Sequence, residues 1–480
     1  MKVKHNKYKL SLCEVFFTSV MKVKHNKYKL SFRHLFMDKK VDDILKEILI
    51  KVEPSKEELK NINKSLSQFK GKIEKQIKRH KLDAVLFEGG SFAKKTIIKK
   101  DIYDIDLFLR FSEKFKANSG KICINSSSRK SQIKGQDISE LTEKLLKGFK
   151  KVHLIHGSRD YFQIRGSKDF FIELIPVINV KDPKKAENIT DLSYSHVMYI
   201  NKRIKIQKIL DEIKIAKAFC YATKTYGAES YIKGFSGYSL ELLIYYYKSF
   251  LKFIKVIAGH KKDKIIIDIE KHYKNKNDVL LDMNSSKLGS PIILVDPTYP
   301  QRNVLAALSE ETFKMFKQAS KKFLKNPSIK DFEIRQIDLE KMKKDALNKK
   351  YEFILLKLET DKPEGAVAGS KLLKFHNHLE NEIKKFFEIN KKGFNYNQKN
   401  SAASFFVVKP KKEIIIEGPF LKDKNNLKKF KKLHKKTFYK LDKIYAREKI
   451  NFSLKEFFED WKKKYQRKIR EMSISDFSVV

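Results

Sequence analysis

The sequence predicts an α+β fold with about three domains. Its 480 residues correspond to that number at roughly 150 residues per domain. Strand-like alternation recurs in the first third, helical periodicity fills the middle, and the last third combines both patterns. Apolar residues make up 41% of the chain, with 36 Phe and 20 Tyr, which is enough to build large cores.

Four segments are expected along the chain. Residues 1–36 form a basic N-terminal extension in which MKVKHNKYKL occurs twice, and the folded protein is expected to begin near Met37. A repeat this perfect indicates a recent tandem duplication or a start site placed too early, because functional repeats diverge and recur more often. The remaining segments are a first domain with a mixed sheet at 37–185, a central helical domain at 186–328, and a C-terminal body with a basic helical tail at 329–480.

The first domain is expected to combine helices and strands. Helical periodicity covers about 40–80 and 138–150, and a serine-rich loop is expected at 117–136. Alternating apolar residues predict strands at Ala84–Phe87, Tyr103–Phe111, Tyr161–Arg165 and Phe170–Val180. Gly89-Gly90-Ser91 is expected to turn the chain between the first two strands.

The central domain is predicted to be mainly helical. Residues 205–258 show helical periodicity with a break at 226–239, where Ser236 is expected to cap a helix. Three lysines interrupt the apolar run 240–259, so this run is predicted to be a buried helix with one wet face and not a membrane span. A strand and a proline-rich turn at 289–303, a helix at 304–325 and a linker near 327 follow.

The C-terminal part is predicted to hold a small α/β module and a basic helix. The module contains a strand at 351–358, a helix at 369–390, and strands at 394–408 and 413–416. A helix from about 425 would place six apolar residues near one stripe: Leu427, Phe430, Leu433, Phe438, Leu441 and Tyr445. Residues 421–450 hold twelve Lys or Arg against three acids. This charge indicates either a solvated face or a surface that follows an RNA backbone.

The overall charge favours a polyanionic partner. The formal net charge is +47, and a field of this strength raises affinity and on-rate for nucleic acid. The alternative is a lysine-rich coding bias. Cys13, Cys123 and Cys220 lie far apart, form no zinc pattern, and fit the reducing cytoplasm in which we expect the protein.

Two acids interrupt the apolar strand at Tyr103–Phe111. Side chains alternate along a strand, so Asp104 and Asp106 share one face. Neighbouring carboxylates repel each other and are costly to bury, so a cation is expected between them, and their oxygens suit Mg²⁺. The alternative for such a pair is a wet surface. Asp101 precedes the strand and is expected to be solvated.

Two further features support a ligand site. The turn Gly89-Gly90-Ser91 lets the backbone approach a phosphate, with Lys94 one turn later; the alternative is an ordinary strand–helix connection. Glu173 lies within the apolar run FFIELIPVINV, where an acid is costly unless paired; a salt bridge to a lysine is the alternative. If both acidic strands are neighbours, three carboxylates and a phosphate turn describe a two-metal centre for nucleotidyl transfer.

These motifs resemble the DNA polymerase β-like nucleotidyltransferase superfamily. The catalytic pattern alone leaves poly(A) polymerases, oligoadenylate synthetases and antibiotic nucleotidyltransferases open. The segments TYGAESYIKGFSGYSLELLIYYYKSF (225–250), VDPTYPQRNVLAAL (295–308) and IEGPFLK (416–422) are similar to those of the archaeal, class I CCA-adding tRNA nucleotidyltransferases. The resemblance runs from about Met37 to beyond residue 450.

The resemblance implies roles for individual residues. Asp104, Asp106 and Glu173 match the three acids that hold Mg²⁺, although the third is commonly Asp. Nucleotide contacts match seven residues: Gly90, Ser91, Lys94, His196, Lys217, Tyr226 and Arg302. Lys94 replaces the usual Arg, which removes bidentate phosphate binding, and the spacing from Ser91 to Asp106 is one residue longer than usual. Structural alternatives are a helix cap for His196, a surface lysine at 217 and a core tyrosine at 226.

The resemblance also implies an activity. A member of this family adds C, C and A to the tRNA 3′ end from CTP and ATP without a template, at one site. The first domain would be catalytic, the central domain would bind nucleotide and tRNA, and the C-terminal body and tail would grip the acceptor stem and TΨC arm. The alternatives are a poly(A) polymerase-like enzyme and an inactive tRNA-binding homologue. Whether the chain forms a homodimer is left open.

Overall fold

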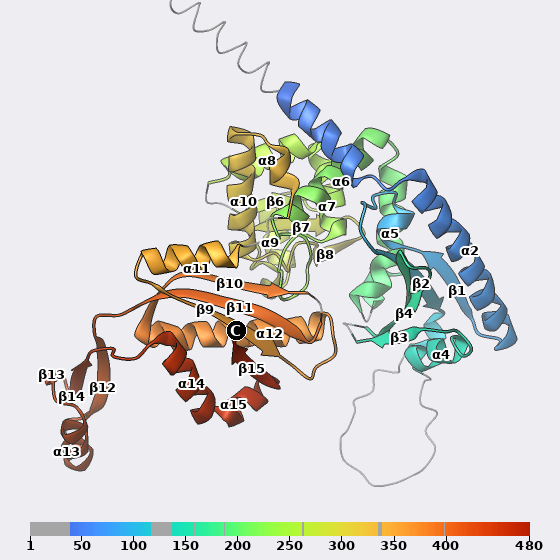
Figure 1. The fold of residues 1–480 in the computed structure, drawn as a ribbon. Helices are drawn as coiled ribbons and strands as arrows, with labels where there is room; N and C mark the ends of the chain where they lie inside the picture. Colours follow the sequence, from blue (N-terminus) through green and yellow to red (C-terminus); the bar gives the residue numbers. More distant parts are fainter. Residues whose placement is uncertain are drawn as a thin grey trace, which may run out of the picture.

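The computed structural model describes residues 39–116, 137–156, 159–186, 188–261, 264–334, 338–397 and 399–480. The extension expected at 1–36 and the loop expected at 117–136 lie outside these residues. The described chain combines helices with mixed and antiparallel sheets, which confirms the predicted α+β class. Figure 1 shows the parts in sequence order, from the first sheet through the central helices to the C-terminal sheet.

A five-stranded sheet forms the first part, with the order β1-β2-β5-β4-β3. Its strands are β1 (Ala84–Glu88), β2 (Tyr103–Phe111), β3 (Val152–Ile155), β4 (Tyr161–Arg165) and β5 (Phe170–Ile178). β2 and β5 are parallel, and the other neighbouring pairs are antiparallel. The four predicted strands are therefore confirmed, and β3 is an addition.

Helices cover one face of this sheet. α2 (Lys56–Arg79) begins at a capping box between Ser55 and Glu58, and α4 (Ile138–Leu145) begins at Asp137. The buried residues of α2 recur at helical spacing and pack with the inward side chains of β2 in one core: Ile62, Leu66, Phe69, Ile73, Ile77, Ile105, Leu107 and Leu109. Because these apolar residues turn toward the helices, the alternating acids of β2 turn to the opposite face.

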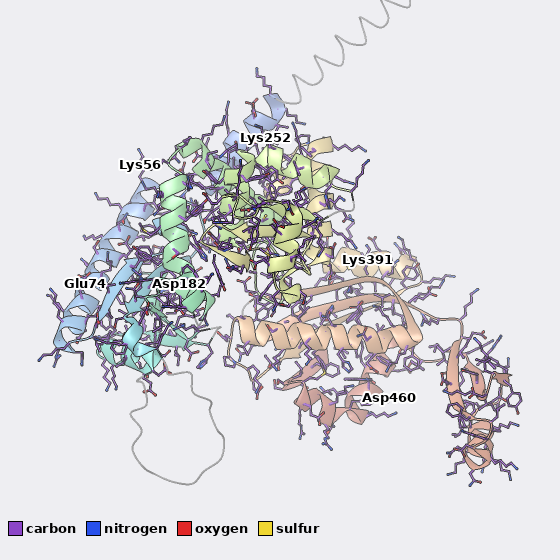
Figure 2. All side chains as sticks on the ribbon, turned by 180° about the vertical axis from the view of Figure 1, so that it is seen from behind. Lys56, Glu74, Asp182, Lys252, Lys391 and Asp460 are labelled. Carbon is purple, nitrogen blue, oxygen red and sulfur yellow. The ribbon has the colours of Figure 1, made fainter. Side chains whose placement is uncertain are left out.

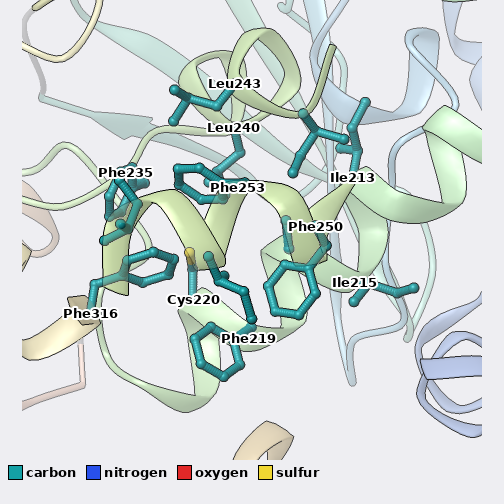
Figure 3. Close-up of a cluster of buried hydrophobic side chains, with 14 of the residues drawn as sticks. Ile213, Ile215, Phe219, Cys220, Phe235, Leu240, Leu243, Phe250, Phe253 and Phe316 are labelled. Atoms are coloured by element: carbon teal, nitrogen blue, oxygen red, sulfur yellow. The ribbon is translucent and has the colours of Figure 1, made fainter. Parts of the chain in front are cut away.

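The central part is mainly helical. It contains α5 (Ser193–Arg203), α6 (Gln207–Ala222), α7 (Gly237–Tyr247), α8 (Phe250–Gly259), α9 (Lys276–Asp282), α10 (Glu310–Lys325), β6 (Ile265–Ile267), β7 (Ile292–Asp296) and β8 (Tyr299–Asn303). Figure 3 shows Phe219, Phe235, Phe250, Phe253 and Phe316 meeting in its core. The helix at 39–52 packs against the same core through Val41, Ile44, Leu45 and Ile48.

The apolar run at 240–259 forms two helices, so the single helix predicted there is wrong. α7 ends because Lys248 adopts the left-handed conformation, with φ of 65°. The next residue, Ser249, starts α8 by accepting a hydrogen bond from the backbone N–H of Lys252. The predicted cap at Ser236 is confirmed, since its side chain accepts a hydrogen bond from the backbone N–H of Ser239.

The C-terminal body is a four-stranded antiparallel sheet, in the order β10-β11-β9-β15. Its strands are β9 (Glu352–Glu359), β10 (Phe387–Tyr396), β11 (Ser401–Pro410) and β15 (Asp476–Val479), and its helices are α11 (Leu339–Asn348), α12 (Ala366–Phe386), α14 (Leu454–Lys464) and α15 (Gln466–Glu471). The single strand predicted at 394–408 is wrong, because the chain turns between β10 and β11. Pairing with β15 closes the other side of β9.

A small module stands apart from this body in Figures 1 and 2. It consists of β12 (Ile414–Phe420), α13 (Lys424–Leu433), β13 (Thr437–Lys440) and β14 (Lys443–Glu448). The long apolar stripe predicted from 425 is wrong beyond Leu433, where α13 ends. Phe438 and Tyr445 face each other across β13 and β14, and Leu441 lies in the turn between them, 89% exposed.

Charged side chains of both signs cover the surface. Lys56, Lys252 and Lys391 are exposed on different parts of the chain, as are Glu74 and Asp182 (Figure 2). No helix among the described residues is long and apolar enough to cross a bilayer.

Candidate functional site

Three acids share one face of the first sheet. β2 and β5 are parallel neighbours, and Asp106 lies directly opposite Glu173, with Asp104 two residues before Asp106 on β2. The prediction that the strand of Glu173 lies beside the strand of the two aspartates is therefore confirmed. Register partners in neighbouring strands project to the same side, which brings these carboxylates together on the face that the helices leave open.

The acids carry charge that the chain does not fully neutralise. Burial first, and then the charges of Asp106 and Asp104, raise the pKa of Glu173 to about 8. Burial also raises the pKa of Asp106, against the opposing charge of Lys94. Within the described residues Glu173 forms no ion pair with lysine or arginine; Gln163 Nε2 donates to it at 3.3 Å. The salt bridge considered for Glu173 is therefore absent there.

The donor set suits a divalent cation. Carboxylate oxygens in a partly dry site gain most from a hard cation that offsets their repulsion. Lys100 Nζ reaches Asp104 at 3.2 Å, whereas neither Asp106 nor Glu173 forms an ion pair within the part of the chain that the structure describes. As the side chains stand, no three His, Cys, Asp or Glu groups of the described chain converge closely enough to hold one ion. The acids thus line a shared face without closing on one point.

The glycine turn lies directly on Asp106. The backbone N–H of Gly89 donates to the carbonyl oxygen of Asp106 at 3.0 Å. Gly90 has φ of +61°, and a Cβ there would lie 1.7 Å from Asp106 Oδ2. Only glycine fits such a position. The turn thus places Ser91, in the short helix α3 (Gly90–Ala93), beside the acids.

Two predicted lysines meet at a buried acid that the sequence analysis did not single out. Glu241, at 0% exposure, accepts from Lys94 Nζ at 2.6 Å and from Lys217 Nζ at 3.2 Å. Thr96 Oγ1 donates to the same carboxylate at 2.7 Å. Lys217 is 2% exposed, so the surface-lysine alternative is wrong. The signal that points to Glu241 is the one used for Glu173, an acid inside the apolar run LELLIYYY.

A small cavity joins several predicted residues. Ser91, Asp104, Lys217 and Tyr226 all line it, together with Lys100 and other residues of both parts. The ring of Tyr226 stacks on Tyr221 with centroids 4.1 Å apart. Tyr226 is partly buried and packs against the hydrophobic core of the central part, so it also fits the core-tyrosine alternative. The cavity therefore brings the acidic face, the glycine turn and the central helices to one place.

A second buried acid organises the remaining predicted residues. Asp296 Oδ2 contacts His196 Nε2 at 3.0 Å and accepts from Arg302 Nη1 at 2.6 Å. Its other oxygen accepts from Tyr238 Oη at 3.2 Å, and Tyr238 stacks on His196 with centroids 4.0 Å apart. His196 is a buried residue inside α5, so the helix-cap alternative is wrong.

The partners of Asp296 keep its carboxyl group ionised. Burial raises its pKa, but the hydrogen bond from His196 and the charges of His196 and Arg302 hold the pKa of the carboxyl below its usual range. Lys94 Nζ lies 5.9 Å from the ring centroid of Tyr238, so Tyr238 connects this group to Glu241 and its lysines. Sequence reasoning missed Asp296 and Tyr238, although both lie in the segments that carried the resemblance.

Much of this chain is similar in sequence to known proteins. The family described as "tRNA nucleotidyltransferase, second domain" matches residues 211–333. The CCA-adding enzyme of Nanoarchaeum equitans is 36% identical over 292 residues, covering 60% of this chain and 66% of that protein. The enzyme so named from Methanococcus maripaludis is 30% identical over 335 residues, covering 68% of both. That of Methanocaldococcus jannaschii is 28% identical over 417 residues, covering 85% and 87%. The match thus spans just under two thirds of the Nanoarchaeum protein.

Proposed function

Because the chain belongs to the family of CCA-adding enzymes, we propose that it adds C, C and A to the 3′ end of tRNA from CTP and ATP without a template. The observation that best supports this is the arrangement of Asp104, Asp106 and Glu173 beside a glycine turn and two buried lysines. In the reaction, the 3′-hydroxyl oxygen bonds to the α-phosphorus as the bond to pyrophosphate breaks.

Asp104, Asp106 and Glu173 would hold Mg²⁺. The support is chemical: their oxygens are hard donors, and burial and mutual repulsion raise the pKa values of Asp106 and Glu173. When bound, the ion offsets negative charge on the triphosphate and on the attacking oxygen. Gln163 orients the Glu173 carboxylate from β4. The family commonly has Asp at the position of Glu173. The longer side chain of Glu would still offer a carboxylate oxygen to the metal ion on the face shared with Asp104 and Asp106.

The nucleotide is proposed to lie between the first sheet and the central helices. The turn at Gly90 and Ser91 lets backbone N–H groups approach the phosphates of the nucleotide, and Lys94 and Lys217 supply positive charge. Tyr226, stacked on Tyr221, lines the cavity between these parts. His196 and Arg302, held by Asp296, lie on the side of Tyr238, where they are proposed to contact the base.

The tRNA is proposed to reach the acids along a basic cleft. Five cationic or titratable residues line it, with Pro363 and Glu364 of the C-terminal part on the other side: Lys150, Lys151, His153, Arg165 and Lys168. Gln163 lines the same cleft and hydrogen-bonds Glu173, so the cleft leads to the acidic face. The exposed lysines of α13 form a second positive surface, on the module at the far end of the C-terminal body (Figure 1). We propose that the two surfaces together follow the acceptor stem and TΨC arm by their phosphates.

The direct test supplies nucleotides separately to a tRNA that lacks CCA. With Mg²⁺ and CTP alone, the product should grow by two nucleotides; with CTP and ATP together, it should grow by three. Extension of the trimmed tRNA by ATP alone into a long tail would instead indicate poly(A) polymerase-like chemistry. If no nucleotide is incorporated at any Mg²⁺ concentration while tRNA still binds, the chain is an inactive homologue and the proposal fails.

A further inference from the structure

Glu241 lies wholly inside the protein, where the segment after α3 meets α6 and α7. Its Oε2 accepts from Lys94 Nζ at 2.6 Å, and its Oε1 accepts from Thr96 Oγ1 at 2.7 Å and Lys217 Nζ at 3.2 Å. Lys217 Nζ also donates to Thr96 Oγ1 at 2.8 Å and to its carbonyl oxygen at 3.0 Å. One carboxylate thus fixes two ammonium groups from distant parts of the chain.

We propose that Glu241 is a positioning residue for the incoming nucleotide, which holds Lys94 and Lys217 as a fixed cationic pair behind the cavity lined by Ser91 and Tyr226. This inference rests on the proposed function, because it takes the triphosphate to lie at the opening of that cavity, which measures about 30 Å³ and itself has room only for a water-sized group. Lys217 and Thr96 line the cavity, whereas Glu241 does not, so Glu241 acts on the nucleotide through its partners.

The charges of this group leave an excess suited to an anion. Two ammonium groups and one carboxylate sum to one positive charge in a buried place next to the cavity. Burial lowers the pKa of Lys217 to about 8, Glu241 opposes that shift, and Lys94 adds to it. Without the carboxylate, the two lysines would repel each other at low solvent exposure, so they would move apart or lose a proton.

A purely structural ion pair predicts a different outcome. Glu241 also ties the segment after α3 to the central helices, so its loss should lower stability in either case. A structural role alone would leave the affinity for nucleotide unchanged in the protein that remains folded. A positioning role raises the KM for CTP, because the lysines no longer meet the phosphates in a fixed arrangement.

The test compares Glu241→Gln and Glu241→Asp in the full chain, with trimmed tRNA at saturation. Lys94 and Lys217 bind different oxygens of Glu241, and Gln replaces one of these oxygens with an NH₂ donor, so one lysine loses its acceptor. We therefore expect the KM for CTP to rise at least about tenfold with kcat within about threefold of the parent. Asp keeps the charge with a shorter reach, so it should recover part of the affinity. If the Gln variant does not fold, the KM for CTP of the Asp variant still tests the proposal.

Glu212→Gln is the matched control. Glu212 lies in α6 within the same part and accepts from the backbone N–H of Phe250 at 2.7 Å. This variant should leave the KM for CTP unchanged. A second check adds Lys217→Met: if Glu241 acts through Lys217, the two changes together should raise KM little more than Lys217→Met alone. An unchanged KM in folded Glu241→Gln, or full additivity with Lys217→Met, would overturn the proposal.

Direct binding separates this inference from the proposed function. Titration calorimetry of CTP with the full-length parent and the Glu241 variants needs no turnover. Weaker CTP binding in Glu241→Gln, together with no incorporation by the parent, would refute the proposed activity and uphold the positioning role. Equal binding in all variants, with normal incorporation, would refute the positioning role alone.

Discussion

Glu241 and Asp296 resemble Asp106 and Glu173 in burial but differ in their partners. The first two acids contact cationic side chains, and these neighbours oppose the effect of burial and hold their pKa values below the usual range. The second two form no such ion pair within the described ranges. Burial raises the pKa values of both, the charge of Asp104 adds to that of Asp106, and the charges of Asp106 and Asp104 add to that of Glu173. Lys217, a partner of Glu241, and Asp104, the neighbour of Asp106 on β2, line the same small cavity, so acids of the two kinds lie close to one another.

This contrast separates acids that the fold itself neutralises from acids that depend on a ligand. A buried carboxylate with two cationic partners is stable as it stands, and it fixes the positions of those partners. Carboxylates that face each other across β2 and β5 cost free energy until a cation arrives. The contrast predicts that the two groups respond in opposite ways to mutation and to added metal.

The largest effect is expected for Asp106→Ala. Removing this carboxylate should lower nucleotide incorporation by at least roughly 10³-fold, because the acidic face loses its central oxygen donors. Binding of tRNA should change little, and thermal stability should not fall, since a repulsive charge is removed. Single-turnover assays, filter binding and a melting curve measure the three quantities.

Asp101→Asn is the control for that variant. Asp101 lies two residues before β2 and is exposed. Its substitution should leave incorporation within about twofold. Substantial residual activity in Asp106→Ala, or an equal loss in Asp101→Asn, would break the distinction between the acidic face and an ordinary charged surface.

Gly90→Ala tests how closely the turn must approach the acids. The new Cβ would meet Asp106 Oδ2 at 1.7 Å, and the positive φ strains any side chain. We expect a loss of about 1–3 kcal/mol in unfolding free energy and a fall of roughly 10²-fold in incorporation as Asp106 is displaced. The change Gly71→Ala, where nothing lies within 4 Å of the added atom, is the control and should be neutral in activity.

Asp296→Asn tests an acid that the fold neutralises with its own cationic partners. The substitution leaves Arg302 and His196 without their shared anion, so we expect about 3 kcal/mol of lost stability, in contrast to Asp106→Ala. Misplacement of Arg302 should also weaken the preference for the correct nucleotide. Chemical denaturation and competition between CTP and UTP measure these effects. Asp278→Asn, at the start of α9, should leave both unchanged. A stable, fully selective Asp296→Asn would contradict the role of Asp296.

Burial also shifts the pKa of a histidine in the C-terminal body, and this shift makes stability depend on pH. His376 stacks on Phe406, and its Nδ1 lies 2.7 Å from Ser404 Oγ. Burial first, and then Lys392, lower the pKa of His376 from 6.5 to about 4, against the charge of Glu380. The unfolded chain therefore binds a proton that the folded body excludes. Stability should be fully present above pH 6.5 and fall by up to about 3 kcal/mol as the pH drops to 4.

Trp461 makes this pH prediction measurable. It is the only tryptophan in the chain, and it packs in the C-terminal core beside Phe375. Its fluorescence during urea unfolding at several pH values reports the stability of that body. His376→Gln should flatten the dependence between pH 6.5 and 4, whereas the exposed His80→Gln should not. An unchanged slope in His376→Gln would show that another group causes the loss.

The sequence predicted the parts of the fold that local pattern determines. Alternation predicted β2 at its observed bounds, and the acids within it marked the face of the sheet that the helices leave open. That the strand of Glu173 lies beside the strand of Asp106 could be proposed because each acid interrupts an apolar strand, whereas their direct register came from the structure. The turn at Gly90 was recognisable from its glycines, since few other residues accept its backbone conformation.

The rest depends on contacts that local pattern does not carry. Lys94 and Glu241 are 147 residues apart, and His196 and Asp296 are 100 apart, so neither pair leaves a periodic signal. From residue 425, apolar residues spaced for a helix also suit a strand pair once the turn at Leu441 is formed. The cross-strand contact of Phe438 with Tyr445 stabilises the strand pair over a continued helix.

The most direct test of the central claim is metal binding to the acidic face without turnover. Mn²⁺ can stand in for Mg²⁺, and electron paramagnetic resonance counts the free ion in the presence of full-length protein. The parent should bind Mn²⁺, Asp106→Asn with Glu173→Gln should lose that binding, and Glu241→Gln should retain it. Equal Mn²⁺ binding by the parent and by the doubly substituted chain would contradict the account.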